Sequence, residues 1–174
     1  MYWLTGYDTF GYVFFQSLVL DQKGNVILLT RAPDLRQAQN TSNIEDIRIW
    51  VDKDGINPTD DLKQILNELD LKGGNIGVEY EAYGMTGRNA LRLNKSLDNY
   101  CKVEDQSELI TKLRVIKSNE ELVYVRKAAE LADKALDEAW KHSKAGANEA
   151  KILAEMQKAV LEGGGDYPAN EYII

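Results

Sequence analysis

Ser-Asn-Glu-Glu at residues 118–121 decides how this chain is organised. A serine followed three residues later by a glutamate matches the capping box, in which each side chain bonds to the backbone N–H of the other residue. Apolar residues recur every three or four positions after it and predict a long helix. The face predicted to be buried holds Leu122, Val125, Ala129, Ala132, Leu136 and Ala139. We therefore place a junction here, between an α/β unit and a mainly helical unit.

Strands and helices alternate before this junction. Apolar segments at residues 11–20 and 26–29 flank a polar turn at 21–25, which predicts a β-hairpin. Further strands are predicted over residues 44–51, 75–80 and 100–103, with helices between them. Such alternation is typical of an α/β fold, with a mixed β-sheet covered by helices on both faces.

Local signals add detail to these elements. Ile47, Ile49 and Val51 alternate with polar residues and Trp50, so we expect these three on the buried face of their strand. Asn57 before a proline and Thr86 before a helical pattern are predicted N-caps. After the junction, a second helix is predicted from residue 148, and a strand is expected to begin near residue 167.

Bulk composition excludes several classes of function. The formal net charge is −7, which disfavours nucleic acid as a partner because phosphate backbones are also negative. No apolar stretch reaches twenty residues and no secretory signal is visible, so neither a membrane nor secretion is expected. The one cysteine cannot form an intrachain disulfide, which fits a cytoplasmic protein.

Side chains that could perform chemistry are few. His142 is the only histidine, and its place near the end of the long helix favours a solvated helix-end residue. Cys101 lies in a predicted strand without a nearby histidine and is expected to be structural. The residues alone therefore predict no catalytic residue and no metal ligand in this chain.

Two features near the N-terminus remain candidates for binding. The first is an aromatic cluster, which either forms core and interface or lines a substrate pocket; it consists of Tyr2, Trp3, Tyr7, Phe10, Tyr12, Phe14 and Phe15. The second is Arg31, whose guanidinium can bind a carboxylate bidentately. Its alternative is a surface arginine that is solvated or paired with Asp34.

Several segments together resemble one family, that of creatinase, prolidase and aminopeptidase P. Residues 2–7 are similar to its Tyr-Leu-Thr-Gly segment, and residues 113–121 are similar to the hinge before its catalytic domain. Residues 145–149 and 163–168 resemble a turn and the approach to the first strand of that domain. Ala145 and Asn148 replace the family's usual proline and Ser/Thr in that turn, and asparagine also caps helices.

The resemblance implies an architecture. Residues 1–108 would form a creatinase-type N-terminal domain, which is ribonuclease H-like, with a mixed sheet and helices on both faces. Residues 109–174 would form a linker and the first helices of an α+β pita-bread catalytic domain, truncated here. We expect a further strand and helix upstream. The family uses two divalent metal ions (Mn, Co or Zn), held by two Asp, one His and two Glu. This ligand set is expected downstream of Ile174, so this segment is expected to bind none of these ions and to be inactive alone.

The implied function is that of a Xaa-Pro-type metallopeptidase, which hydrolyses peptide bonds next to proline. A homodimer is expected, in which the N-terminal domain shapes the substrate pocket through Tyr7, Tyr12 and, less directly, Arg31. Two alternatives stay open. One is a hydrolase of small amide or amidine compounds, resembling ectoine hydrolase or creatinase. The other is a dimerisation or binding module without catalytic activity.

Overall fold

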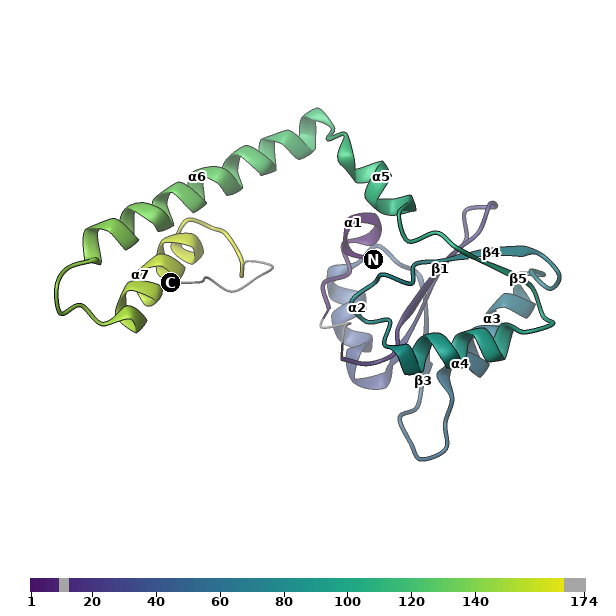
Figure 1. Ribbon diagram of the computed structural model, residues 1–174. Helices are drawn as coiled ribbons and strands as arrows, with labels where there is room; N and C mark the ends of the chain where they lie inside the picture. Colours follow the sequence, from purple (N-terminus) through teal and green to yellow (C-terminus); the bar gives the residue numbers. More distant parts are fainter. Residues whose placement is uncertain (10–12, 168–174) are drawn as a thin grey trace. The chain divides into compact units, whose positions relative to one another are not determined.

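The computed structural model describes residues 1–9 and 13–167 (Figure 1). It divides into two compact units, Met1–Lys112 and Leu113–Ile174. The boundary lies a few residues before Ser118. The assignment of residues 1–108 and 109–174 to two domains of an enzyme stays a prediction.

A three-stranded mixed sheet is the centre of the first unit. Strand β1 (Ser17–Leu20) pairs antiparallel with β2 (Val26–Arg31), so the predicted hairpin is confirmed. Strand β3 (Asp46–Trp50) pairs parallel with β2, which gives the order β1-β2-β3. Strand β1 is shorter than predicted, and residues 11 and 12 of the predicted strand lie outside the described residues.

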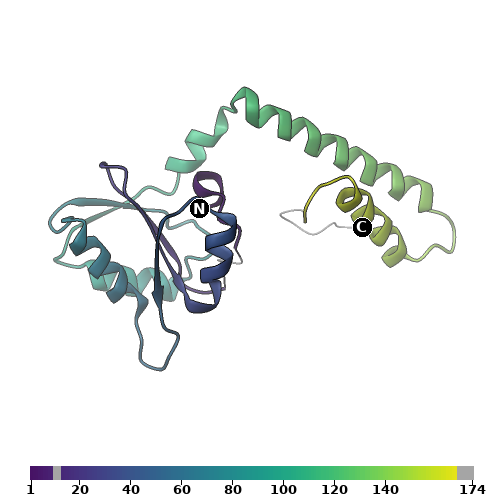
Figure 2. The same cartoon turned by 180° about the vertical axis from the view of Figure 1, so that it is seen from behind.

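A second pair of strands, β4 (Asn75–Val78) and β5 (Lys102–Asp105), is parallel. The helices of this unit are α1 (Tyr2–Thr5), the 3-10 turn η1 (Ala32–Asp34), α2 (Leu35–Thr41), α3 (Pro58–Glu68) and α4 (Gly87–Leu97). Figures 1 and 2 show α2 on one side of the strands, with α3 and α4 on the other.

Strand β2 separates two apolar cores. Ile27 and Leu29 face a core that also contains buried residues of α3 and α4. Leu28 points the opposite way, into a smaller core that contains Ala38 of α2 and Tyr7. Because successive side chains of a strand point to opposite faces, burial of all three requires helices on both faces of the sheet. The predicted α/β fold class is therefore confirmed.

The predicted buried face of β3 is only partly correct, because Ile47 is half-buried against the smaller core but its other members are not buried. Trp50 is 6% exposed, whereas Ile49 and Val51 are 40% and 59% exposed. Strand β3 is the last strand of its sheet, and the indole of Trp50 packs into the core beneath α3 and α4. Period-two alternation defines two faces, but it does not identify the one that a helix covers.

Two helix starts lie where the sequence predicts them. Thr86 caps α4, and its Oγ1 accepts a hydrogen bond of 3.2 Å from the backbone N–H of Asn89. Asn57 occupies the N-cap position of α3, but its side chain makes no capping bond; its Nδ2 donates to Asp60 Oδ1 instead. The proline after Asn57 fixes that start without a side-chain cap.

Helix α5 (Leu109–Val115) crosses the boundary between the units, and the second unit contains α6 (Asn119–His142) and α7 (Glu149–Glu162). The predicted capping box is confirmed. Ser118 Oγ accepts from the Glu121 N–H at 3.2 Å, and Glu121 Oε2 accepts from the Ser118 N–H at 2.7 Å. Asn148 caps α7 as predicted, because its Oδ1 accepts from the N–H of Ala150 at 2.9 Å.

The predicted inner face of α6 is wrong. Val125 and Leu136 are 49% and 54% exposed, whereas Leu131 and Ala135 are buried. Helix α6 carries apolar residues on two stripes, and the stripe through Leu131 and Ala135 is the buried one. Helices α6 and α7 lie side by side in Figures 1 and 2. Met156 is the buried residue of α7, in the middle of its predicted inner face.

The predicted strand near residue 167 lies almost wholly outside the described residues. None of the helices described in residues 1–9 and 13–167 has the length and apolar character needed to span a membrane.

Candidate functional site

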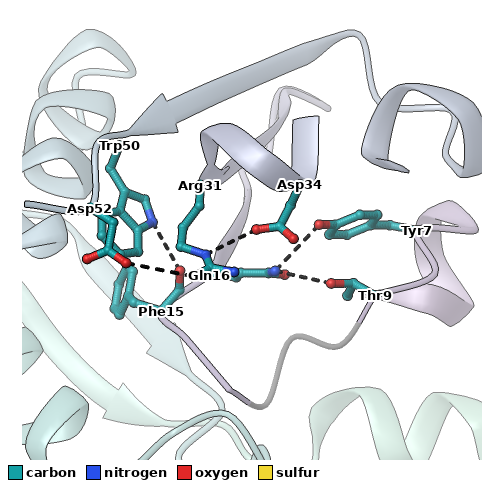
Figure 3. Close-up of polar contacts among 8 residues, drawn as sticks. All are labelled: Tyr7, Thr9, Phe15, Gln16, Arg31, Asp34, Trp50 and Asp52. Atoms are coloured by element: carbon teal, nitrogen blue, oxygen red, sulfur yellow. Dashed lines mark hydrogen bonds and ion pairs between the residues drawn. The ribbon is translucent and has the colours of Figure 1, made fainter. Parts of the chain in front are cut away.

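Polar and aromatic side chains gather at one edge of the three-stranded sheet in the first unit (Figure 3). We call this group the Arg31 corner; it consists of Tyr7, Thr9, Phe14, Gln16, Arg31, Asp34 and Asp52. Arg31 ends β2 and is the register partner of Trp50, which ends β3. Because parallel strands end at the same sheet edge, Arg31 and Asp52 come together although they are far apart in sequence.

Arg31 is held on three sides. Its Nε donates to Asp34 Oδ2 at 3.2 Å, and its Nη1 lies 3.7 Å from Asp52 Oδ2. Its guanidinium carbon lies 3.5 Å from the centre of the Phe14 ring, which is a cation–π arrangement. The Arg31 and Asp34 side chains are 24% and 14% exposed. Arg31 is therefore paired with Asp34 in the structure, and its predicted role in substrate binding stays a prediction.

The charge balance of the corner limits its chemistry. One guanidinium faces two carboxylates, so the three groups carry a net charge of −1 when all are ionised. A substrate carboxylate that approached Arg31 would meet both aspartates as well. This arrangement favours a role for Arg31 in positioning Phe14 and its neighbours over direct capture of an anion.

Gln16 links the corner to Tyr7 and Thr9. Its Nε2 donates to Thr9 Oγ1 at 3.1 Å and to Tyr7 Oη at 3.4 Å. Its Oε1 is buried and has no hydrogen-bond partner within the described residues. Buried polar atoms are usually bonded, so this oxygen can accept from a water or from an N–H or O–H group of a bound molecule.

Tyr7 is fully buried, so its ring does not line a solvent-accessible pocket in this structure. The preceding Gly6 has φ +78°, and an added Cβ would lie 2.8 Å from the carbonyl oxygen of Thr41. The backbone N–H of Tyr7 donates to Thr5 Oγ1 at 3.2 Å. These contacts fix Tyr7 beside α2, and its predicted role in substrate binding stays a prediction. Tyr12 lies outside the described residues.

A buried hydrogen bond anchors the segment that carries Phe14 and Gln16. The indole Nε1 of Trp50 donates to the backbone carbonyl of Phe15 at 3.1 Å (Figure 3). Phe15 is itself 7% exposed and packs in the larger core. The core thereby holds this segment against the end of β2.

Sequence patterns gave no signal for three members of this corner, which are Thr9, Gln16 and Asp52. Thr9 and Gln16 are single polar residues on either side of an aromatic run, and Asp52 follows a strand whose buried face the sequence predicts only in part. Register between β2 and β3 would have placed Asp52 near Arg31, but no local pattern specifies register.

Cys101 has no features of a nucleophile. It is half-buried, and this burial raises the pKa of its thiol. A nucleophilic cysteine needs the opposite shift, because the thiolate is the reactive form.

The structure also tests whether the implied pair of metal ions could bind here. Among residues 1–9 and 13–167, one group of three or more His, Cys, Asp or Glu side chains has ligand atoms close enough to share an ion: Glu138, His142 and Glu155. It contains no aspartate. A set of two Asp, one His and two Glu has no counterpart in the described part of the chain, so we derive no catalytic step through metal ions.

Comparison with known proteins gives the context of this geometry. The chain is 27% identical, over 95% of its length, to an uncharacterised hydrolase/peptidase of Sinorhizobium fredii, of which it covers 44%. It is 26% identical, over 97% of its length, to an ectoine hydrolase of Halomonas elongata, of which it covers 46%. It therefore spans less than half the length of these relatives.

A solved structure, that of a recombinant prolidase from Thermococcus sibiricus, matches with a TM-score of 0.76 at 21% identity. The match covers 98% of this chain and 45% of that one, and it establishes likeness of fold. The sequence profile of the creatinase/prolidase N-terminal domain matches residues 1–116, which include the sheet, both cores and the Arg31 corner. The chain therefore belongs to the creatinase/prolidase N-terminal domain family.

Proposed function

We propose that this chain forms the N-terminal part of a Xaa-Pro-type metallopeptidase, which hydrolyses peptide bonds next to proline. The observation that carries the proposal is the family match over residues 1–116, continued by a similar fold across 98% of the chain in a prolidase. The hydrolase and peptidase names of the relatives support the same reaction class.

In this proposal the two divalent metal ions are bound by residues that follow Ile174. The first unit shapes the substrate pocket and contributes to a homodimer in the cytoplasm. Tyr2 and Trp3, which are 69% and 40% exposed, support a contact with a second subunit because large exposed aromatic residues are enriched at interfaces.

The Arg31 corner would act in this pocket by positioning. Arg31 holds Phe14 by stacking, and Gln16 holds Tyr7 and Thr9, so these side chains of the Arg31 corner are fixed against the sheet. Side chains that are already held in place lose less conformational entropy when a ligand binds.

A second candidate is hydrolysis of a small cyclic or N-acylated amidine. The relative named as an ectoine hydrolase favours it, since that protein is 26% identical to this chain and the relative named as a hydrolase/peptidase is 27% identical. The two candidates share the proposed fold and metals and differ in the substrate.

The deciding experiment starts from the coding sequence downstream of Ile174. The full-length protein is purified, stripped of metal, reloaded with Mn²⁺, Co²⁺ or Zn²⁺, and assayed against Xaa-Pro dipeptides and against ectoine. We expect metal-dependent cleavage of the dipeptides. Turnover of ectoine alone would replace the peptidase proposal with the second candidate. A downstream sequence without the two Asp, one His and two Glu would remove both.

The positioning role has its own test in the same enzyme. Arg31→Gln removes the charge and the stacking plane, and Arg36→Gln is the matched control because Arg36 is exposed on the adjacent helix α2. We expect Arg31→Gln to raise KM more than it lowers kcat, and Arg36→Gln to change neither. Equal kinetics for the two variants would exclude a role for Arg31.

A further inference from the structure

Helices α6 and α7 of the second unit pack along one defined stripe. On α6 the stripe runs through Leu131, Ala135, Glu138 and His142, at the three- and four-residue spacing of one helix face. At one end of the pair, a Cβ on Gly163 would lie 2.3 Å from Leu131 Cδ2, so the chain after α7 approaches α6 closely. Apolar packing therefore fixes the two helices before any polar contact is considered.

Three ligand-type side chains lie at the other end of this stripe. Glu138 and His142 are four residues apart on α6, and Glu155 faces them from α7. One oxygen or nitrogen from each residue lies within 4.8 Å of the others, and all three residues are half-buried. His142 Nε2 lies 3.2 Å from Glu138 Oε2.

These distances suit a small cation with mixed nitrogen and oxygen ligands. Zinc lies about 2.0–2.2 Å from such atoms, so neighbouring ligands of a tetrahedral ion are about 3.4 Å apart. The His142–Glu138 pair already has this separation. A movement of the Glu155 carboxylate by about one bond length would bring its oxygen to the same separation from the other two ligand atoms.

We propose that Glu138, His142 and Glu155 bind a divalent transition-metal ion of the zinc class, which links α6 to α7. Water completes the coordination. The imidazole selects zinc, cobalt, nickel or copper over calcium and magnesium, which prefer sites made of oxygen alone. The ion has a structural role in this proposal, and the proposal does not depend on the proposed function.

Two lysines compete with the ion. Lys141 Nζ lies 3.1 Å from both carboxylate oxygens of Glu138, and Lys158 Nζ lies 3.7 Å from Glu155 Oε2. Both lysine side chains are mostly exposed, at 65% and 57%. Ion pairs between exposed long side chains contribute little, so a divalent ion with three ligands can displace them.

Calorimetric titration of the 174-residue chain with Zn²⁺, after removal of metal with a chelator, tests the proposal. We expect one ion per chain, and a weakening of Kd of at least about tenfold in His142→Ala and in Glu155→Gln, since even losing a ligand's outer partner costs that much. Glu130→Gln, which changes an exposed carboxylate of α6 off the stripe, should leave Kd unchanged within twofold. Cys101→Ser should also bind normally, which excludes zinc bound to the thiol.

A second readout separates binding at this site from loss of folding. Co²⁺ bound in a tetrahedral site absorbs visible light, and this absorption should be lost in His142→Ala while the helical circular dichroism of the variant stays that of the parent. Failure of Zn²⁺ to bind the parent chain at millimolar concentration would overturn the proposal. Binding that survives both His142→Ala and Glu155→Gln would overturn it equally, and would leave surface ion pairs as the role of these side chains.

Discussion

Gly6 provides the sharpest test of how the first unit is held together. The substitution is Gly6→Ala. Gly6 adopts φ +78°, and an added methyl group would lie 2.8 Å from the backbone carbonyl oxygen of Thr41. That oxygen belongs to the end of α2 and cannot rotate away as a side chain would.

The expected cost has two parts. We expect Gly6→Ala to lower the free energy of unfolding of the first unit by about 3 kcal/mol, with about 1 kcal/mol from the left-handed conformation and about 2 kcal/mol from the displaced contact. Gly55→Ala is the matched control, because Gly55 has φ +79° and no heavy atom within 4 Å of the added Cβ. It should cost only the conformational part, about 1 kcal/mol.

Amide hydrogen exchange at Leu28 and Leu29 measures this free energy for the first unit alone. Both residues are at most 1% exposed in the central strand, so their amides exchange when the unit opens. The difference between the two variants isolates the contact with Thr41. Equal destabilisation by Gly6→Ala and Gly55→Ala would refute the reasoning, because it would mean that residues 1–9 do not pack tightly against α2.

Three further predictions concern single interactions. Ser118→Ala should destabilise the start of α6 by about 1 kcal/mol, as measured by hydrogen exchange of the first-turn amides, and Ser118→Asp should retain most of the stability of the parent. Unchanged exchange in Ser118→Ala would refute the role of the capping box. Trp50→Phe should lower the free energy of unfolding by about 3 kcal/mol, as measured by urea titration, because it leaves the Phe15 carbonyl unpaired and opens space in the core. A loss of less than about 1 kcal/mol would contradict both effects. The hydrogen bond from Arg48 lowers the pKa of Asp46. At pH values above the ordinary aspartate pKa, the ion pair should therefore stabilise the fold by about 0.5 kcal/mol. This stabilisation should disappear as the pH falls through the lowered pKa of Asp46. Asp46→Asn should therefore be less stable than the parent at pH 7 and equal to it near pH 2; a difference that persists at low pH would assign the effect to something other than charge.

The elements of the fold could be predicted because their signals are local. The capping box at Ser118, the cap at Thr86 and the polar turn after β1 each act within a few residues of themselves. A hydrogen bond between near neighbours needs no partner from a distant segment, so these signals can be recognised in the sequence.

The faces of these elements could not be predicted in the same way. Both β3 and α6 have apolar residues on more than one face, and the buried face is the one that another element covers. In β3 that choice buried Trp50, and in α6 it buried Leu131 and Ala135. Which face is buried depends on chain segments tens of residues away, and the periodicity of a single element contains no information about those segments.

The sequence by itself determined the α/β class, the junction near Ser118, the succession of helices and strands, and the resemblance that the family match confirms. Tertiary structure alone decided that Arg31 meets Asp52 and that Glu155 faces His142. Arg31 and Asp52 meet because of strand register, and Glu155 faces His142 because of the packing angle of two helices. Strand register and helix packing both depend on how apolar side chains from distant segments pack together, and this packing exists only in the folded protein.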